Sequence, residues 1–249
     1  MPFTFSHPAI ILPLTSVKKW PFSFTGLVVG SIVPDFEFLF RLRETEIFAH
    51  TPVGIIVFDL PFAIILSFVF HGIIRNTLIL NLPIPLQQRL YPFTAFNWNV
   101  YFKRHVLNFF ISVAIGLGSH FFLDAFTHAY GVFVTNTILL RTTVQVLFYT
   151  IPVYYILQLL LSLCGAMYIG WFVFTIKKVA VAQAQNNPLR YWLLIWFIGI
   201  VFFILRLYVY PQYQSVNDII IAFFGCLVYA LLLVSLYYHR YTKKTKKAL

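Results

Sequence analysis

Long apolar runs divide the chain into segments that predict membrane-spanning helices. The runs occupy residues 52–74, 106–128, 146–176, 191–210 and 217–238. A bilayer core of about 30 Å requires about 20 apolar residues in one helical span, and each run reaches that length. The runs are continuous rather than alternating, which favours helices over a membrane β-barrel. The pattern therefore predicts an all-α, polytopic membrane protein with about five transmembrane helices.

The first apolar segments of the chain differ from these runs. Residues 8–17 and 21–34 are each too short to cross a bilayer comfortably at about 1.5 Å per helical residue. We expect them to form an N-terminal helical hairpin with the pair Lys18–Lys19 at its inner tip. In the second segment, Gly26 and Gly30 form a small-xxx-small pattern, which allows a neighbouring helix to approach closely.

Composition and charge support a membrane location. The chain is 60% hydrophobic and only 10% charged, whereas soluble domains carry about 25% charged residues. The net charge of +11 comes from Lys and Arg clustered in short loops, without the aromatic interleaving of a nucleic-acid-binding face, so no nucleic-acid partner is expected. Fourteen of the 18 basic residues fall on the side of the C-terminal tail. This bias predicts a multi-pass protein of the bacterial cytoplasmic membrane with a cytoplasmic C-terminus.

The stretch "GSHFFLDAFTHAYG" (118–131) places histidine and aspartate at the end of an apolar span. In the predicted orientation, span 106–128 ends at the outer face, span 52–74 begins there, and both ends of the hairpin reach the same side. Six side chains are therefore expected to converge near the outer face: His7, Asp35, His50, His120, Asp124 and His128. Imidazole and carboxylate together suit zinc, manganese or iron.

Within this set, His120 and Asp124 are four residues apart and share one helix face, and His128 continues that face with a drift of roughly 80°. Each residue also has a simpler interpretation. A single intramembrane histidine can merely hydrogen-bond a neighbouring helix, and Asp35 can cap the hairpin or pair with Arg41 or Arg43. The convergence of several ionisable groups at membrane depth nevertheless favours a functional site.

Asp59 lies at a depth similar to that expected for His120. We expect its carboxylate to hydrogen-bond His120 and orient it toward the metal. A helix-bending Asp-Leu-Pro step, in which Asp59 bonds its own backbone, explains the residue equally well.

Four segments carry a family resemblance: "MPFTFSHPA", "GSIVPDFEF", "AHTPVGIIVFDLP" and "SHFFLDAFTH". They resemble an uncharacterised bacterial integral-membrane family whose members open MPFTxSHPA. More distantly, they are similar to predicted membrane-bound metal-dependent hydrolases and to the zinc-dependent phospholipase C and single-strand nuclease superfamily. The resemblance covers residues 1–131. It implies metal-ligand roles for these residues: His7, Asp35, His50, His120 and Asp124.

Two departures from the distant relatives change the expected metal content. A further HxxxD-type element of the soluble enzymes is missing, and "FAH" replaces the His-Arg-Gly step of the hydrolases. We therefore expect one or two divalent ions, zinc first and manganese or iron as alternatives, instead of a three-metal cluster.

Together these features predict a membrane-embedded metal-dependent hydrolase of a phosphoester or lipid-linked substrate. Metal-activated water would be the nucleophile, with Asp35 or Asp124 as general base. Residues 1–131 would form the metal-site half, and 132–249 would add three transmembrane helices and a basic cytoplasmic tail in one integral unit. The alternative is a non-enzymatic membrane protein with a structural or transported ion, as in a transporter, sensor or scaffold. The last two spans have almost no interior polar residues, which counts against a transporter.

Overall fold

Helices dominate the chain in a computed structural model that describes residues 4–16, 22–45, 47–181 and 188–247. Five helical segments are long and apolar enough to cross a membrane: Pro52–Leu80, Val106–Asn136, Val153–Thr175, Pro188–Val209 and Val216–Tyr241. The all-α class and the five predicted spans are confirmed.

The chain divides into two compact units that interleave along the sequence. The first unit comprises Met1–Asp35, Phe48–Ala63 and His105–Phe172, and the second comprises Phe36–Ile47, Ile64–Arg104 and Val173–Leu249. No unit boundary coincides with residue 131. The functional division into 1–131 and 132–249 stays a prediction.

The N-terminal hairpin of the first unit has two different arms. The first arm consists of the 3₁₀ helices η1 (Thr4–Ile10) and η2 (Leu12–Ser16). Pro8 and Pro13 lie inside these elements, and a proline removes the backbone donor that an α-helix needs there. The second arm is α1 (Phe24–Ile32), which contacts η1 and continues into η3 (Val33–Asp35). The predicted lysine tip lies outside the described residues.

Helix α1 packs against α8 (Val106–Thr127) with backbone in close approach. A Cβ on Gly30 would collide with the carbonyl group of Val113, and a Cβ on Gly116 would collide with that of Leu27. The packing role predicted for the small-xxx-small pattern in α1 is therefore confirmed, and Gly116 supplies its counterpart in α8.

The first predicted span is a helical run with two π-helical turns. It comprises α3 (Pro52–Gly54), η4 (Ile55–Asp59), α4 (Leu60–Val69), η5 (Phe70–Ile74) and α5 (Arg75–Leu80), of which η4 and η5 are the π-helical turns. These two turns contain Asp59 and His71, which are polar residues in an otherwise apolar sequence. Single π-helical turns within α-helices occur frequently at functional sites.

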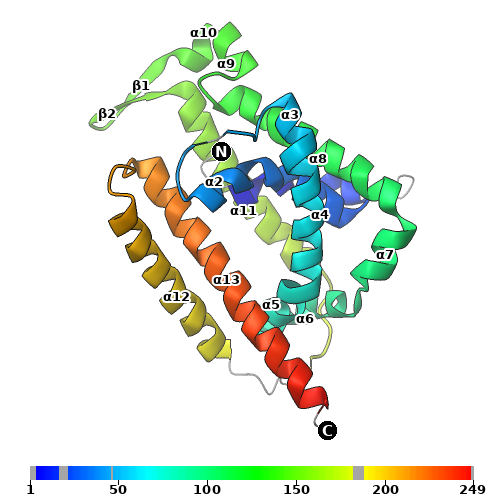
Figure 1. The fold of residues 1–249 in the computed structure, drawn as a ribbon. Helices are drawn as coiled ribbons and strands as arrows, with labels where there is room; N and C mark the ends of the chain where they lie inside the picture. Colours follow the sequence, from blue (N-terminus) through cyan, green and yellow to red (C-terminus); the bar gives the residue numbers. More distant parts are fainter. Residues whose placement is uncertain (1–3, 17–21, 46, 182–187, 248–249) are drawn as a thin grey trace. The chain divides into compact units, whose positions relative to one another are not determined.

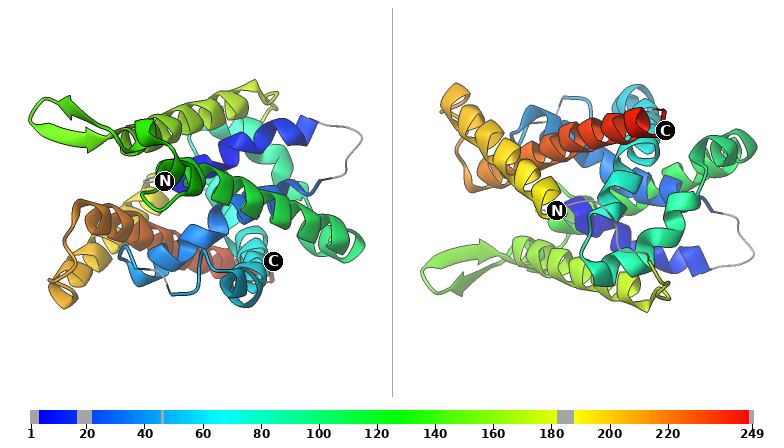
Figure 2. Two further views of the ribbon diagram at one scale, coloured as in Figure 1. Left: turned by 90° about the horizontal axis from the view of Figure 1, so that it is seen from above. Right: turned by 90° about the horizontal axis from the view of Figure 1, so that it is seen from below.

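The third predicted span starts later than the apolar run does. Residues 146–152 belong to a β-hairpin of β1 (Thr143–Val146) and β2 (Tyr149–Pro152), and α11 (Val153–Thr175) begins only at Val153. The β-branched residues of this segment favour strands, and Leu147 makes the turn with φ 53°. Figures 1 and 2 show the hairpin at the end of α11. The short helices α9 (Val132–Asn136) and α10 (Ile138–Arg141) precede it.

In the second unit, α12 (Pro188–Val209) and α13 (Val216–Lys247) lie side by side (Figure 1). Their shared core is formed by Tyr191, Ile195, Ala230 and Val234. The remaining helices of this unit are α2 (Phe36–Arg41), α6 (Ile84–Leu90), η6 (Tyr91–Ala95) and α7 (Trp98–Arg104).

A buried arginine fixes the segment that follows α2. Arg206, only 3% exposed, donates from Nε to the carbonyl oxygen of Leu42 at 2.9 Å and from Nη1 to that of Tyr213 at 2.5 Å. Leu42 itself adopts φ 53°. The bond to Leu42 therefore holds a strained turn against the end of α12, and the bond to Tyr213 holds the loop that follows α12.

Candidate metal centre

His50 is placed by a tight turn before the first span. The backbone of Thr51 donates to the carbonyl oxygen of Phe48, and the Thr51 hydroxyl caps the following helix by accepting from the N–H of Gly54 at 2.9 Å. A Cβ on Gly54 would collide with the Phe48 carbonyl, so the turn requires glycine there. His50 has φ 63°, a left-handed conformation that histidine adopts more readily than most residues. The local backbone of the motif "FAHTPVG" thus fixes the orientation of His50.

His120 is oriented by the neighbouring helix α1. Its Nδ1 donates to the backbone carbonyl of Ser31 at 2.9 Å, which leaves Nε2 as the metal-binding nitrogen of the neutral ring. His120 is fully buried. The Ser31 carbonyl therefore makes the orienting contact that the sequence suggested for Asp59. Asp59 is also fully buried, and its role at the site stays a prediction.

His7 and Asp35 come together from the two arms of the hairpin. The His7 Nδ1 donates to the carbonyl oxygen of Thr4 at 3.1 Å, and the same nitrogen lies 4.0 Å from Asp35 Oδ2. Within the described structure, His7 Nε2 and Asp35 Oδ2 are buried without a hydrogen-bond partner. Because buried polar atoms are nearly always satisfied in proteins, a bound cation would give both atoms the partner that burial calls for.

Four of the six predicted ligands form one compact cluster. Asp35, His50, His120 and Asp124 each offer a ligand atom, and all four atoms lie within 4.8 Å of one another. The Nε2 atoms of His50 and His120 are 3.2 Å apart, and they lie 3.3 and 3.0 Å from Asp124 Oδ2. Asp35 Oδ1 lies 3.5 Å from His120 Nε2. The predicted convergence of these four residues on one metal-binding cluster is therefore supported by their geometry.

The chemistry of the cluster fits a cation. Because His120 uses its Nδ1–H for Ser31, the Nε2 lone pair of the neutral ring faces a carboxylate oxygen of Asp124. Two acceptors at 3.0 Å require a proton or a metal ion between them. Two carboxylates and two imidazoles within bonding reach of one point are a donor set that suits zinc, manganese or iron.

The remaining two predicted ligands flank this cluster. His7 stacks on His120 with ring centroids 4.2 Å apart, and its Nε2 lies 3.5 Å from Asp124 Oδ1. His128 Nδ1 lies 3.4 Å from the same oxygen. The angular drift expected for His128 does not apply, because α8 ends at Thr127 and His128 continues in an extended conformation. Asp124 is thus the shared partner of four histidines.

Two of the predicted ligands, His7 and Asp35, lie outside the membrane spans. Burial and neighbouring charges keep both in protonation states that can bind metal. Burial lowers the pKa of His7, and the adjacent His120 lowers it further, against the opposing effect of Asp124. For Asp35, burial raises the pKa, but the imidazoles of His120 and His7 outweigh burial, so that the pKa lies below its usual value. His7 therefore favours the neutral ring and Asp35 the carboxylate.

The histidines of the cluster differ in exposure. The side chains of His7 and His120 are 0% exposed, whereas those of His50 and His128 are 13% and 24% exposed. His50 and His128 are therefore the histidines of the cluster that have surface exposed to the surroundings.

Sequence reasoning missed the part that Ser31 plays in this site. Its contribution is a backbone carbonyl, which no side-chain pattern reveals. The available signal was indirect: Ser31 follows Gly30, the residue at which α1 approaches α8 most closely.

Comparison with known proteins identifies a family whose function is unknown. A family model described as a domain of unknown function, DUF4184, matches residues 1–236. No curated protein and no solved structure shows a significant match to the chain. The expected membership of an uncharacterised family is confirmed, and the distant similarity to metal-dependent hydrolases stays a prediction.

Proposed function

The chain belongs to the DUF4184 family, whose function is unknown, and we propose that it is a membrane-embedded metal-dependent hydrolase of phosphoester substrates. One observation carries the proposal: two carboxylates and two imidazoles place ligand atoms within 4.8 Å of one another in a buried cluster. Ionisable residues at membrane depth are rare and mark functional sites. The five apolar helices supply the membrane setting.

The residues divide naturally into ligands and proton-transfer groups. Asp35, His50, His120 and Asp124 would hold one or two divalent ions, with His7 and His128 as further ligands. A bound divalent ion would supply Lewis acidity, lowering the pKa of coordinated water toward about 7. The carboxylate left outside the ion's coordination shell, Asp35 or Asp124, would accept the proton from the attacking water as general base.

The position of the exposed histidines supports a lipid or lipid-linked substrate. His50 and His128 are the exposed histidines of the cluster; His50 directly precedes the Thr51 cap of one apolar helical segment, and His128 is the C-cap of another. A site at the end of two spans lies near lipid headgroups, so the substrate we propose is a lipid or lipid-linked phosphoester. The bias of basic loops supports an orientation in which this face lies at the outer side of the bacterial cytoplasmic membrane.

Activity measurements test the proposal directly. The purified full-length protein, loaded with Zn²⁺ or Mn²⁺, would be assayed with bis(p-nitrophenyl) phosphate, p-nitrophenyl phosphate and mixed micelles of phosphatidic acid. We expect turnover of at least one substrate and its loss in Asp124→Asn, with His105→Gln, the N-cap residue of the same helix, as the control. Metal retention without any turnover would contradict the hydrolase and favour a non-enzymatic role.

The alternative, a structural or transported ion, has one observation in its favour. His7, Asp35, His120 and Asp124 are all less than 10% exposed, and structural metal sites are closed. Removing the ion distinguishes the two functions: a structural ion stabilises the fold strongly, whereas a catalytic ion is needed mainly for turnover.

The proposed orientation has a separate test. A cysteine introduced at Lys177, which is exposed, should resist a membrane-impermeant thiol reagent in intact cells and react after the membrane is opened. Labelling of this cysteine in intact cells would instead favour a metal cluster at the cytoplasmic face.

A further inference from the structure

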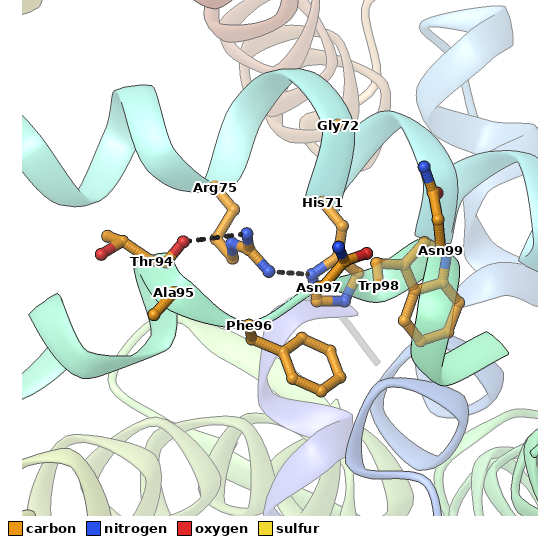
Figure 3. Close-up of a pocket in the computed structure, with 9 residues that line it drawn as sticks. All are labelled: His71, Gly72, Arg75, Thr94, Ala95, Phe96, Asn97, Trp98 and Asn99. Carbon is orange, nitrogen blue, oxygen red and sulfur yellow. Dashed lines mark hydrogen bonds between the residues drawn. The ribbon is translucent and has the colours of Figure 1, made fainter. Parts of the chain in front are cut away.

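A cavity in the second unit surrounds a buried arginine. The cavity has a volume of about 320 Å³ and is lined by residues of the π-helical turn η5, the start of α5, η6 and α7. Figure 3 shows the guanidinium group of Arg75 between the main chain of Thr94 and the ring of His71, with Trp98 beside His71. Ligand pockets in proteins begin at about 300 Å³, so the space is sufficient for a small ligand group.

Arg75 carries a buried charge without a carboxylate partner. The residue is only 6% exposed. It donates from Nε to Asn76 Oδ1 at 2.9 Å, from Nη1 to His71 Nδ1 at 2.9 Å and from Nη2 to the Thr94 carbonyl at 3.4 Å. These three acceptors are neutral, and none of the nine described residues that line the cavity is acidic. Because a buried charge is costly unless it is paired, an anion in the cavity would compensate the charge of Arg75.

The hydrogen bonds leave donors for such an anion. A guanidinium group has five N–H donors, and the three hydrogen bonds of Arg75 leave two of them for a ligand. Because Arg75 always donates, His71 must accept at Nδ1, so its neutral ring carries the proton on Nε2. The planar fork of arginine matches the oxygen geometry of phosphate groups.

Aromatic rings hold this arrangement in place. The His71 ring stacks on Trp98 with centroids 4.6 Å apart and an interplanar angle of 10°. The Arg75 guanidinium lies 5.9 Å from the centroid of Phe96. His71 also lies in the π-helical turn η5, a local distortion that is common at functional sites. The cation and the histidine are therefore positioned before any ligand binds.

We propose that the cavity lined by His71, Arg75, Asn97 and Asn99 binds the phosphate group of a small ligand or of a lipid headgroup. Arg75 pairs with the phosphate oxygens, and Asn97, which Figure 3 shows near the ring of His71, and Asn99 supply further amide donors to the cavity lining. The site is independent of the metal centre, because it uses none of the metal-binding residues.

The experiment measures phosphate binding to the full-length protein after treatment with EDTA, so that phosphate held by a metal ion does not contribute. One arm is an isothermal titration with inorganic phosphate in an uncharged detergent. The other arm counts phosphatidic acid molecules retained from phosphatidylcholine nanodiscs that contain this lipid. We expect Arg75→Gln to weaken binding by at least about tenfold, with Arg104→Gln, an exposed arginine on α7, as the charge-matched control.

A second variant keeps the proposal testable if Arg75→Gln fails to fold. Gly72 lines the cavity, and a Cβ there meets no atom within 4 Å. Gly72→Leu therefore adds a bulky side chain at the cavity wall while the guanidinium stays, and Gly170→Leu is its control because that glycine also faces open space.

The outcomes separate the two sources of phosphate. Saturable binding of inorganic phosphate that both cavity variants abolish identifies a free phosphate ligand. Retention of phosphatidic acid alone, lost in the same variants, identifies a lipid headgroup. If neither probe binds, or if binding is the same in the cavity variants and in their controls, the proposal is overturned.

Discussion

The contact between α1 and α8 yields a quantitative prediction for Gly116→Ala. A Cβ at position 116 would lie 2.4 Å from the carbonyl oxygen of Leu27 and 2.7 Å from the backbone nitrogen of Ser31, whereas ordinary van der Waals contact begins at 3.4 Å. Helix α1 must therefore retreat by about 1.0 Å at Leu27 and about 0.7 Å at Ser31, since backbone atoms cannot rotate out of the way as a flexible side chain can.

This retreat acts directly on a metal ligand. The carbonyl oxygen of Ser31 accepts the Nδ1–H of His120 at 2.9 Å. A displacement of about 0.7 Å stretches the contact to about 3.6 Å, a distance at which a hydrogen bond no longer exists. Loss of such an orienting partner typically weakens metal binding by about 10- to 100-fold, and the overpacked helix pair loses about 1–3 kcal/mol of unfolding free energy.

A competition titration with a fluorescent zinc chelator measures the predicted loss of affinity, and thermal unfolding measures the loss of stability. Gly118→Ala is the matched control on the same helix, because a Cβ there meets no atom within 4 Å. A zinc affinity in Gly116→Ala equal to that of Gly118→Ala would refute the inference that α1 positions His120.

Three further predictions concern the surroundings of the site. Thr51→Ala removes the helix cap beside His50 and should cost about 1 kcal/mol of unfolding free energy, measured by thermal unfolding; Thr51→Ser should restore it. Arg206→Met removes two charge-assisted hydrogen bonds and should lower the free energy of unfolding by about 3–6 kcal/mol; unchanged thermal unfolding would contradict a stabilising role of these bonds. In metal-free protein, the lowered pKa of His7 means that the unfolded state binds more protons below about pH 6.5. The free energy of unfolding of the wild type should therefore fall more between pH 7.5 and 5.5 than that of His7→Gln. Identical pH dependence in the two proteins would contradict a lowered pKa of His7.

The spans were predictable because hydropathy alone decides which helices cross a bilayer. The structure departs from continuous α-helix where backbone chemistry overrides hydropathy. Proline inside the first hairpin arm gives 3₁₀ helix instead of α-helix, and the β-branched segment before Val153 forms a hairpin instead of extending α11. Both segments are apolar, so a hydropathy pattern does not separate them from helix.

The ligands of the metal cluster were predictable because their positions follow from helix ends. His50, His120 and Asp124 lie where spans begin or end, and topology brings such ends to one face. The contacts that orient them were not predictable: the carbonyl of Ser31 has no side-chain signal, and the cavity around Arg75 depends on Thr94, nineteen residues away.

Metal content tests the central claim most directly. The full-length protein, purified without added chelator, would be analysed by inductively coupled plasma mass spectrometry beside His120→Ala, Asp124→Ala and the control His105→Ala. The cluster predicts about one or two divalent ions per chain in the wild type and in the control, and near-complete loss in both cluster variants. A wild type that holds no metal, or cluster variants that keep the wild-type stoichiometry, would contradict it.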